Sequence, residues 1–312
     1  MENNMSSHDK NTRSIYQKQH ERISGNKDAF SRISGMYKEN TLGMTADWFK
    51  GKRAVDIGCG NIGAMMIRLL ELGVIYCTGV DIDSDWIKPL SENIERAGFH
   101  EGRFELKTGS VTNVPFEDES FDFVSVNGVL IHLENLDEIE KGFMDAARVT
   151  AVNGALYTSW GPCGGVMQGV IFPALRSHYK TDPVFKKFID EITPDQLHKA
   201  FEKIGEDSCK YGGEAIDVGV LKSLFGEDYC VFLQNFIQAP TWWSNECTPE
   251  YVEKLYKKAG FEQVRRISSF TRRADVRKFF APLHYDRNYW LSKILYGHGY
   301  VQYIGERKSR AG

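Results

Sequence analysis

The chain has 312 residues, of which 42% are hydrophobic and 26% charged, and its formal net charge is −3. This is the composition of an ordinary globular protein, and its mild negative charge gives no reason to expect a nucleic acid or an anionic membrane as partner. No apolar run approaches the roughly 18–20 residues of a membrane span, and the polar N-terminus contains no signal-peptide core. We therefore expect a cytoplasmic protein without a membrane partner.

The first predicted segment is polar. Residues 1–26 hold few large apolar groups, so they form either a flexible segment or a lid that orders on binding. In a lid, Tyr16 and His20 would close over the ligand. The apolar spacing from residue 27 to residue 48 then predicts one or two helices.

Strands and helices alternate from residue 54 onward, the pattern of a parallel sheet covered by helices on both faces. Asn135 is expected to cap the third of the helices, because Glu138 follows three residues later. The expected strands are 54–57, 75–81, 104–108, 121–127 and 155–159, and the expected helices are 61–72, 84–97 and 136–149.

The regular alternation stops between residues 161 and 247, a stretch too long for a loop, which predicts an inserted cap subdomain that binds substrate. Thr248 and Pro249 then mark a helix start, and Gly260 its end. A strand at 263–270, a second insertion near 271–297 and a last strand at 299–308 follow. The expected organisation is an N-terminal segment at 1–26, a core at 27–160 and 248–312, and the cap at 161–247.

The six cysteines are scattered, with no C-x-x-C pair and no Cys/His spacing of a metal site. We expect free, buried thiols and no bound metal.

The sequence "GCGNIG" between the first strand and helix holds Gly58, Gly60 and Gly63, a G-x-G-x-x-G pattern. Such a turn lets the backbone approach a ligand and directs N–H groups toward it. Asp56 would repel a pyrophosphate but attract an ammonium group, which favours a ligand with an amino-acid moiety over a nicotinamide dinucleotide. Asp81, at the end of the next strand, can accept ribose hydroxyls, which both ligands have.

Further motifs decide between these ligands. "VDIGCG", "GVDI", "GSV", "PFEDESFDFV" with "NGVLIHL", and "RVTAVNGAL" together resemble the motifs of the class I S-adenosylmethionine-dependent methyltransferases. The resemblance covers about residues 50–160 and returns at 248–308. It implies a Rossmann-like, doubly wound, mostly parallel seven-stranded α/β sheet, and S-adenosyl-L-methionine as the cofactor.

The resemblance also implies a set of cofactor-binding residues. Many family members carry an acidic residue where Ser110 stands, so the adenine contact differs here, and the late position of Gly63 assigns it to helix packing. The methionine part would be held by Asp56, Gly58, Cys59 and Gly60, the ribose by Asp81, the adenine by Ile82, Ser110 and Val111, and the region near the sulfonium by Asn127.

Methyl transfer from a sulfonium is an in-line displacement, so the protein mainly aligns the acceptor and excludes water. His132, just past the fourth strand, is the candidate catalytic base. Trp160, at the end of the fifth strand, is expected at the pocket mouth. Tyr285 and Arg287 belong to an aromatic and basic insertion that would bind the acceptor, including an anionic group.

The expected function is therefore methyl transfer to an O, N or S atom of a small molecule, with a homodimer left open. One alternative is an RNA or other nucleic-acid methyltransferase, which the mild acidity and the lack of an N-P-P-Y-like tetrapeptide disfavour. The other is a non-methylating S-adenosylmethionine-binding protein of the same fold.

Overall fold

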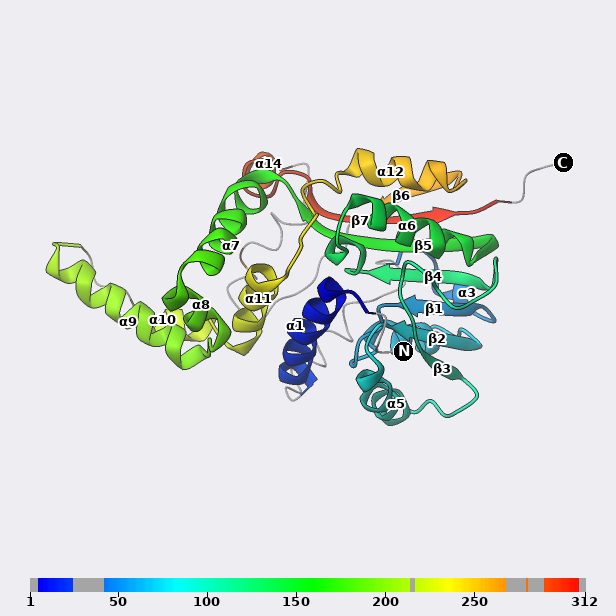
Figure 1. The fold of residues 1–312 in the computed structure, drawn as a ribbon, viewed down its shortest axis with the longest axis horizontal. Coiled ribbons are helices and arrows are strands. Elements are labelled where there is room, and N and C mark those ends of the chain that lie inside the picture. Colours follow the sequence, from blue (N-terminus) through cyan, green and yellow to red (C-terminus); the bar gives the residue numbers. More distant parts are fainter. Residues whose placement is uncertain (1–4, 25–41, 214–216, 268–278, 280–288, 309–312) are drawn as a thin grey trace.

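The computed structural model describes residues 5–24, 42–213, 217–267, 279 and 289–308. Its centre is a seven-stranded sheet with strand order β3-β2-β1-β4-β5-β7-β6 (Figure 1). All neighbouring strands pair in parallel except β7, which is antiparallel to both β5 and β6. The expected doubly wound, mostly parallel sheet is confirmed.

The strands follow the apolar runs of the sequence. Two of them have the predicted bounds, whereas β5 is longer than predicted because antiparallel pairing with β7 continues as far as Cys163 and Thr150 pairs with Phe121 of β4. The strands are β1 Arg53–Ile57, β2 Tyr76–Asp81, β3 Phe104–Thr108, β4 Phe121–Asn127, β5 Thr150–Cys163, β6 Gln263–Ile267 and β7 Gly299–Glu306.

Helices cover both faces of the sheet with their apolar sides. On one face lie α4 (Ala64–Glu71) and α5 (Ile87–Arg96), the latter preceded by the 3-10 turn η3 (Ser84–Trp86). On the other lie α6 (Leu136–Arg148) and α12 (Pro249–Lys258). Each face thus has its own hydrophobic core.

Two predicted helix starts are confirmed by their caps. The Asn135 side chain accepts a hydrogen bond from the Glu138 N–H at the start of α6. The Thr248 side chain accepts from the Tyr251 N–H at the start of α12, where Pro249 takes the first position. Both caps satisfy a backbone donor that a helix start leaves unpaired.

The predicted N-terminal segment contains a long helix, α1 (Ser7–Ser24), and the short helix α3 (Ala46–Phe49) precedes the first strand. In Figure 1, α1 (dark blue) lies between the sheet and a set of helices to one side. Residues 25–41, which include most of the helices expected at 27–48, lie outside the described residues.

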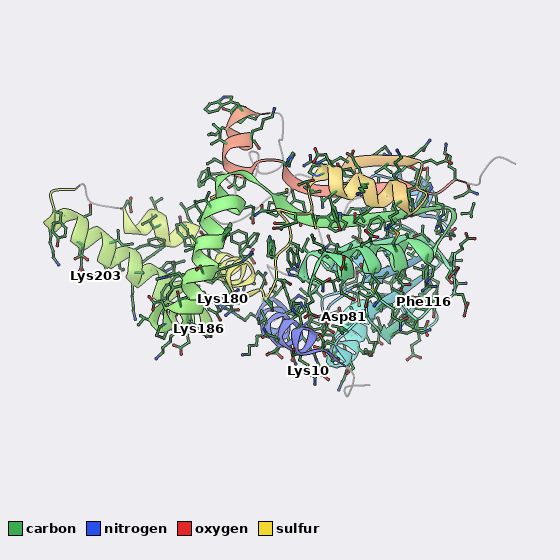
Figure 2. All side chains as sticks on the ribbon, turned by 45° about the horizontal axis from the view of Figure 1, so that its top comes forward. Lys10, Asp81, Phe116, Lys180, Lys186 and Lys203 are labelled. Carbon is green, nitrogen blue, oxygen red and sulfur yellow. The ribbon has the colours of Figure 1, made fainter. Side chains whose placement is uncertain are left out.

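The segment between β5 and α12 is helical and largely extends away from the sheet (Figure 1). Its outer helices have a small core of their own around Ile192, Leu197 and Cys230. Figure 2 shows Lys203 on this outlying part and Asp81 within the sheet-containing part. The elements are η5 Met167–Ile171, α7 Phe172–Thr181, α8 Pro183–Asp190, α9 Pro194–Lys210, α10 Val218–Leu224 and α11 Glu227–Gln238; α14 Trp290–Tyr296 comes just before β7.

All six cysteines are free; Cys209 is exposed, Cys59 is partly buried and the other four are buried. Within the described part of the chain, no helix is both long enough and apolar enough to cross a membrane.

Candidate functional site

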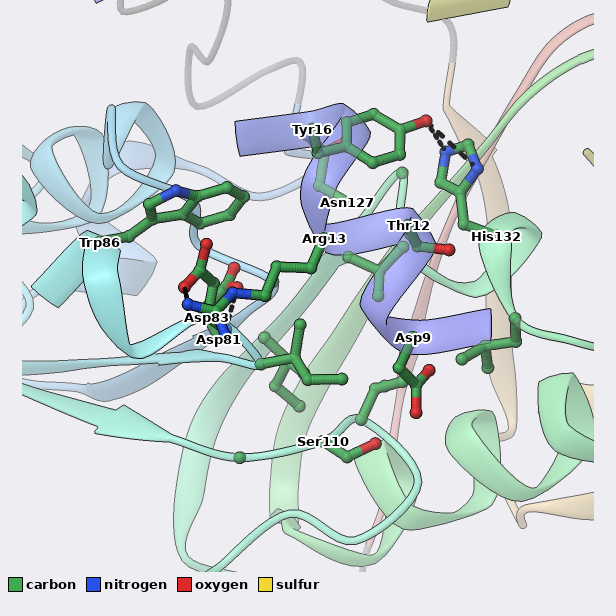
Figure 3. Close-up of a pocket in the computed structure, with 18 of the residues that line it drawn as sticks. Asp9, Thr12, Arg13, Tyr16, Asp81, Asp83, Trp86, Ser110, Asn127 and His132 are labelled. Carbon is green, nitrogen blue, oxygen red and sulfur yellow. Dashed lines mark hydrogen bonds and ion pairs between the residues drawn. The ribbon is translucent and has the colours of Figure 1, made fainter. Parts of the chain in front are cut away.

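A cavity of about 200 Å³ opens at the carboxyl ends of β1, β2 and β4, beneath α1 (Figure 3). Strand order reverses between β1 and β4, and doubly wound sheets bind their ligands at such a switch point. The residues that line it are Asp9, Thr12, Arg13, Tyr16, His20, Ile57, Gly58, Asp81, Ile82, Asp83, Trp86, Gly109, Ser110, Val111, Asn127, Gly128, Val129, His132 and Leu133.

The glycine turn after β1 forms one wall. Gly58 has φ 80°, and a Cβ there would lie 2.1 Å from Val129 Cγ2, so only glycine fits. Gly63 also has a positive φ, 65°, but a Cβ there would meet Leu90 Cδ1 of α5 at 2.2 Å. Gly63 does not line the cavity and belongs to helix packing, as its position in the motif indicated.

Asp81 is fixed by the backbone on both sides of its carboxylate. Oδ2 accepts a hydrogen bond of 3.0 Å from the Gly60 N–H, and Oδ1 accepts one of 3.0 Å from the Asp83 N–H. Burial raises the pKa of Asp81 to about 6, against the effect of these two bonds. Because each carboxylate oxygen has a second lone pair, Asp81 can still accept from hydroxyls in the cavity.

Asp56 lies behind the cavity wall, with 3% of its surface exposed. Its Oδ1 has no hydrogen-bond partner among the described residues. Burial, and secondarily the charge of Asp81, raises the pKa of Asp56 to about 7. A buried acceptor without a donor requires an explanation, and an ammonium group or a water brought in with a ligand would supply one.

Six of the nine residues implied to bind the cofactor line the cavity: Gly58, Asp81, Ile82, Ser110, Val111 and Asn127. Asp56, Cys59 and Gly60 do not. Gly60 is shielded by His20 of α1, whose ring carbon Cε1 lies 2.8 Å from where a Gly60 Cβ would stand. The Ser110 hydroxyl is already within 3.0 Å of the Thr112 hydroxyl.

Two residues of the cavity wall were not predicted from the sequence: Arg13 of α1 and Trp86 of η3. Arg13 forms ion pairs of 2.7 Å with both Asp83 and Asp85, and the His20 ring stacks on Trp86 with centroids 4.6 Å apart. Trp86 could have been noticed, because it lies in the first turn after Asp81. The sequence did not indicate a role for Arg13, because its partner Asp83 is 70 residues away along the chain.

His132 lies at the end of the 3-10 turn η4 (Leu130–His132), beneath α1. Its Nε2 is 2.9 Å from the Tyr16 hydroxyl, and its Nδ1 is 3.3 Å from the Thr241 carbonyl oxygen (Figure 3 for the Tyr16 contact). A carbonyl only accepts, so we assign the proton to Nδ1 and the free lone pair to Nε2. Burial lowers the pKa of His132 to about 4, so the ring is neutral at neutral pH.

Three residues were expected to bind the methyl acceptor: Trp160, Tyr285 and Arg287. The expectation that Trp160 lies at the pocket mouth is wrong. Its side chain is fully buried in the core, stacks on Phe143 of α6 and donates a hydrogen bond of 2.8 Å from Nε1 to Thr158 Oγ1. Side chains alternate between the two faces of β5, and Trp160 points to the face that packs against α6. Tyr285 and Arg287 lie outside the described residues.

Comparison with known proteins agrees with this geometry. Residues 55–158 match the model of a family described as "Methyltransferase domain". The chain is 30% identical over 142 residues to a demethylmenaquinone methyltransferase of Desulfitobacterium hafniense, covering 41% of this chain and 54% of that protein. An uncharacterized protein of Haemophilus influenzae is 30% identical over 127 residues, covering 41% of this chain and 49% of that protein. The chain thus spans about half the length of the curated relatives it matches.

Solved structures with a similar fold include a SAM-dependent methyltransferase from Methanosarcina mazei, with TM-score 0.46, 18% identity and coverage of 84% of this chain and 94% of that one. Another is a SAM-dependent methyltransferase from Thermotoga maritima titled a possible histamine N-methyltransferase, with TM-score 0.43, 16% identity and coverage of 93% and 99%. The cavity residues from Ile57 to Leu133 lie within the part of the chain that matches the methyltransferase-domain model, whereas α1 lies outside it. This match and the order of the sheet agree with the class I, S-adenosylmethionine-dependent type that the sequence motifs indicated.

Proposed function

We propose that the protein binds S-adenosylmethionine in the cavity beneath α1 and transfers its methyl group to an O, N or S atom of a small molecule. The observation that carries this proposal is Asp81, held by two backbone N–H groups beside the glycine turn of a methyltransferase domain. Its remaining lone pairs face the cavity, where ribose hydroxyls would need an acceptor.

The residues present fit the cofactor. Asp81 would hold the ribose, Ile82 and Val111 would contact the adenine, and Asn127 would line the strand end near the reacting atoms. The unpartnered Oδ1 of Asp56 fits the ammonium of the methionine part, reached directly or through water. When bound, S-adenosylmethionine supplies a methyl group that is already activated, so the protein's task is alignment and exclusion of water.

His132 is the proposed general base. Its neutral ring and its Nε2 lone pair suit it to take a proton from an acceptor hydroxyl, thiol or ammonium group. In the present arrangement the Tyr16 hydroxyl occupies that lone pair. The acceptor would therefore either displace Tyr16 or pass its proton through the phenol.

Helix α1 is the proposed lid. It covers the cavity with Arg13, Tyr16 and His20, which contact the ends of β2 and β4 through Asp83, His132 and Trp86. A closed lid excludes water from the reaction. It also favours a small acceptor over a polynucleotide, and the demethylmenaquinone named for the Desulfitobacterium relative is likewise a small molecule.

The experiment is calorimetric titration with S-adenosylhomocysteine, with NADH in a parallel titration. We expect micromolar binding of the first and none of the second. Asp81→Asn should weaken S-adenosylhomocysteine at least about tenfold, because an amide cannot accept from two backbone donors and a ribose at once. The matched control is Asp122→Asn, since Asp122 also accepts from a backbone N–H, that of Arg53 at 2.8 Å, outside the cavity. Binding of NADH alone, or an Asp81→Asn affinity within about threefold of wild type, would refute the cofactor proposal.

A further inference from the structure

Arg176, on α7, reaches the same group of side chains as His132. Its guanidinium lies 5.1 Å from the centroid of the Trp242 ring, and the His132 ring meets that indole edge-on at a centroid distance of 5.0 Å. Tyr16 lies against His132 in turn, with ring centroids 4.9 Å apart. Arg176 is therefore one indole away from the proposed base and the lid tyrosine.

The guanidinium is incompletely satisfied. Its Nε donates to the Phe236 carbonyl oxygen of α11, but its buried Nη2 has no hydrogen-bond partner among the described residues. It forms no ion pair with any acidic side chain of the described part of the chain. Burial lowers the pKa of Arg176 to about 10, although Tyr16 and the exposed Glu246 act in the opposite direction. Arg176 is partly buried, and leaving its buried Nη2 without an acceptor costs free energy, so an anionic partner would complete the arrangement.

Arg176 is not itself among the residues that line the cavity, but two side chains of the cavity wall lie near its charge. Tyr16 and His132 both line the cavity, and the charge of Arg176 acts on both. Burial raises the pKa of Tyr16 and the charge of Arg176 opposes this, whereas for His132 burial and the charge of Arg176 both lower the pKa. The positive charge therefore lies on the acceptor side of the site. At the opposite side, Arg13 is held by Asp83 and Asp85, so its charge is already balanced.

We propose that Arg176 binds a carboxylate of the methyl acceptor and so positions the acceptor beside His132. This rests on the proposed function and names its substrate class: a small carboxylate. A single negative charge balances one guanidinium, whereas a phosphate carries up to about two and would leave excess charge in a buried site. The sequence placed anion recognition at Arg287, which lies outside the described residues; among the described residues the geometry points to the helical segment after β5.

The test uses carboxylate probes, each paired with its neutral amide: acetate with acetamide, and benzoate with benzamide. Each is titrated into the full chain saturated with S-adenosylhomocysteine. For wild type, at least one carboxylate should bind about tenfold or more tightly than its amide, and benzoate more tightly than phenyl phosphate. Arg176→Met should reduce the preference to about twofold or less, and Arg176→Lys should keep part of it.

Arg103→Met is the matched control. Arg103 also donates to backbone carbonyls, those of Val74 and Ile75, and lies 5.9 Å from the Phe99 ring centroid. It stands just before β3, at the amino end of the strand, whereas the cavity lies at the carboxyl ends of the strands. It should leave the carboxylate preference unchanged. S-adenosylhomocysteine affinity, measured first on every variant, shows whether each one is folded.

The outcomes separate the two proposals. If wild type does not bind S-adenosylhomocysteine, the proposed function fails. If it binds that ligand but shows no carboxylate preference, or keeps the preference in Arg176→Met, the role of Arg176 is refuted. Tighter binding of phenyl phosphate than of benzoate would overturn the carboxylate assignment.

Discussion

Asp56 combines deep burial with an oxygen that lacks a donor. The glycine pattern alone suggested a ligand, and Asp56 indicated which kind, because a carboxylate at this turn favours an ammonium group over a pyrophosphate. Its degree of burial was not readable from the sequence, since it depends on the strands on either side, β2 and β4, which pair with β1.

Asp56→Asn should stabilise the ligand-free protein, and more at pH 8 than at pH 4.5. The folded-state pKa of Asp56 is about 7, against an ordinary value of 3.8. Between these values the folded state binds more protons than the unfolded state, so the free energy of unfolding falls as pH rises and levels off above pH 7. Asparagine does not ionise, so the variant avoids this fall in the free energy of unfolding. Thermal unfolding at both pH values should show a gain of about 2 °C or more at pH 8.

The same substitution should weaken S-adenosylhomocysteine about tenfold or more, because the amide lacks the charge that would hold the ammonium. If the variant is less stable than wild type at pH 8, or if its unfolding temperature changes equally at both pH values, then Asp56 is not a buried carboxylate that lacks a compensating partner.

His132→Asn should leave S-adenosylhomocysteine affinity within about threefold and reduce turnover about 10²–10⁴-fold, if the ring is the base. Since burial lowers the pKa of His132 to about 4, the ring loses no base function between pH 8 and about pH 5. The pH dependence of kcat/KM, measured with labelled donor and a carboxylate acceptor, should show no acidic limb from His132 in that range. His100→Asn, at an exposed histidine, is the control; a limb near pH 6.5 that disappears with His132 would contradict the lowered pKa.

At the scale of elements, agreement with the sequence did not depend on how central a strand is, since β3 is an edge strand of the sheet and β4 an interior one. β3 and β4 have the predicted bounds, whereas helix α4 begins at Ala64, three residues later than predicted. The delay has a physical reason: Gly60 and Gly63 both adopt positive φ angles, which a right-handed helix does not contain.

Two helices in the insertion were not predicted although their signals are present. Asp182 caps α8 by accepting from the Val184 and Phe185 N–H groups, with Pro183 at its first position. Thr193 and Gln196 form a complete capping box on α9. These pairs follow the same rule as Thr248 and Pro249, and applying it throughout the chain would have found them.

Gly63→Ala should lower stability without affecting the cofactor. The added Cβ would lie 2.2 Å from Leu90 Cδ1 and the residue would keep a φ of 65°, so we expect a loss of about 1–3 kcal/mol in the free energy of unfolding. S-adenosylhomocysteine affinity should stay within about threefold. Gly58→Ala is the contrasting variant, since its Cβ would press on Val129 in the cavity wall and reduce affinity. Lost affinity in stable Gly63→Ala would return Gly63 to the ligand site.

At the scale of the whole molecule, α1 joins two parts that the sequence treated separately. One face of the helix covers the cavity, and near its end Arg22 forms an ion pair with Glu227 and donates to the Gln234 side chain and the Ile192 carbonyl oxygen. These contacts link α1, the proposed lid, to the helical segment, and Figure 1 shows α1 between the sheet and that segment.

Arg22→Met should loosen this link while leaving the sheet intact. Amide hydrogen exchange should become faster in α1 and α11 and remain unchanged in β1 and β4, with a loss of about 1–3 kcal/mol confined to those helices. S-adenosylhomocysteine should also dissociate faster. Arg96→Met on α5 is the control, because within the part of the chain that the structure describes Arg96 bonds only to Asn93 of its own helix. Faster exchange throughout the sheet, or none in α1, would contradict the linkage.

The sequence by itself determined the sheet and the glycine turn and indicated the class of ligand, because strand alternation, positive-φ glycines and strand-end aspartates are local features with short-range causes. Only the tertiary structure decided that Trp160 belongs to the core, that α1 covers the cavity with Arg13, and that Arg176 lies against Trp242. These contacts are between residues that lie tens to hundreds of positions apart in the chain. They depend on how helices outside the sheet pack, and no periodicity in the chain encodes that packing.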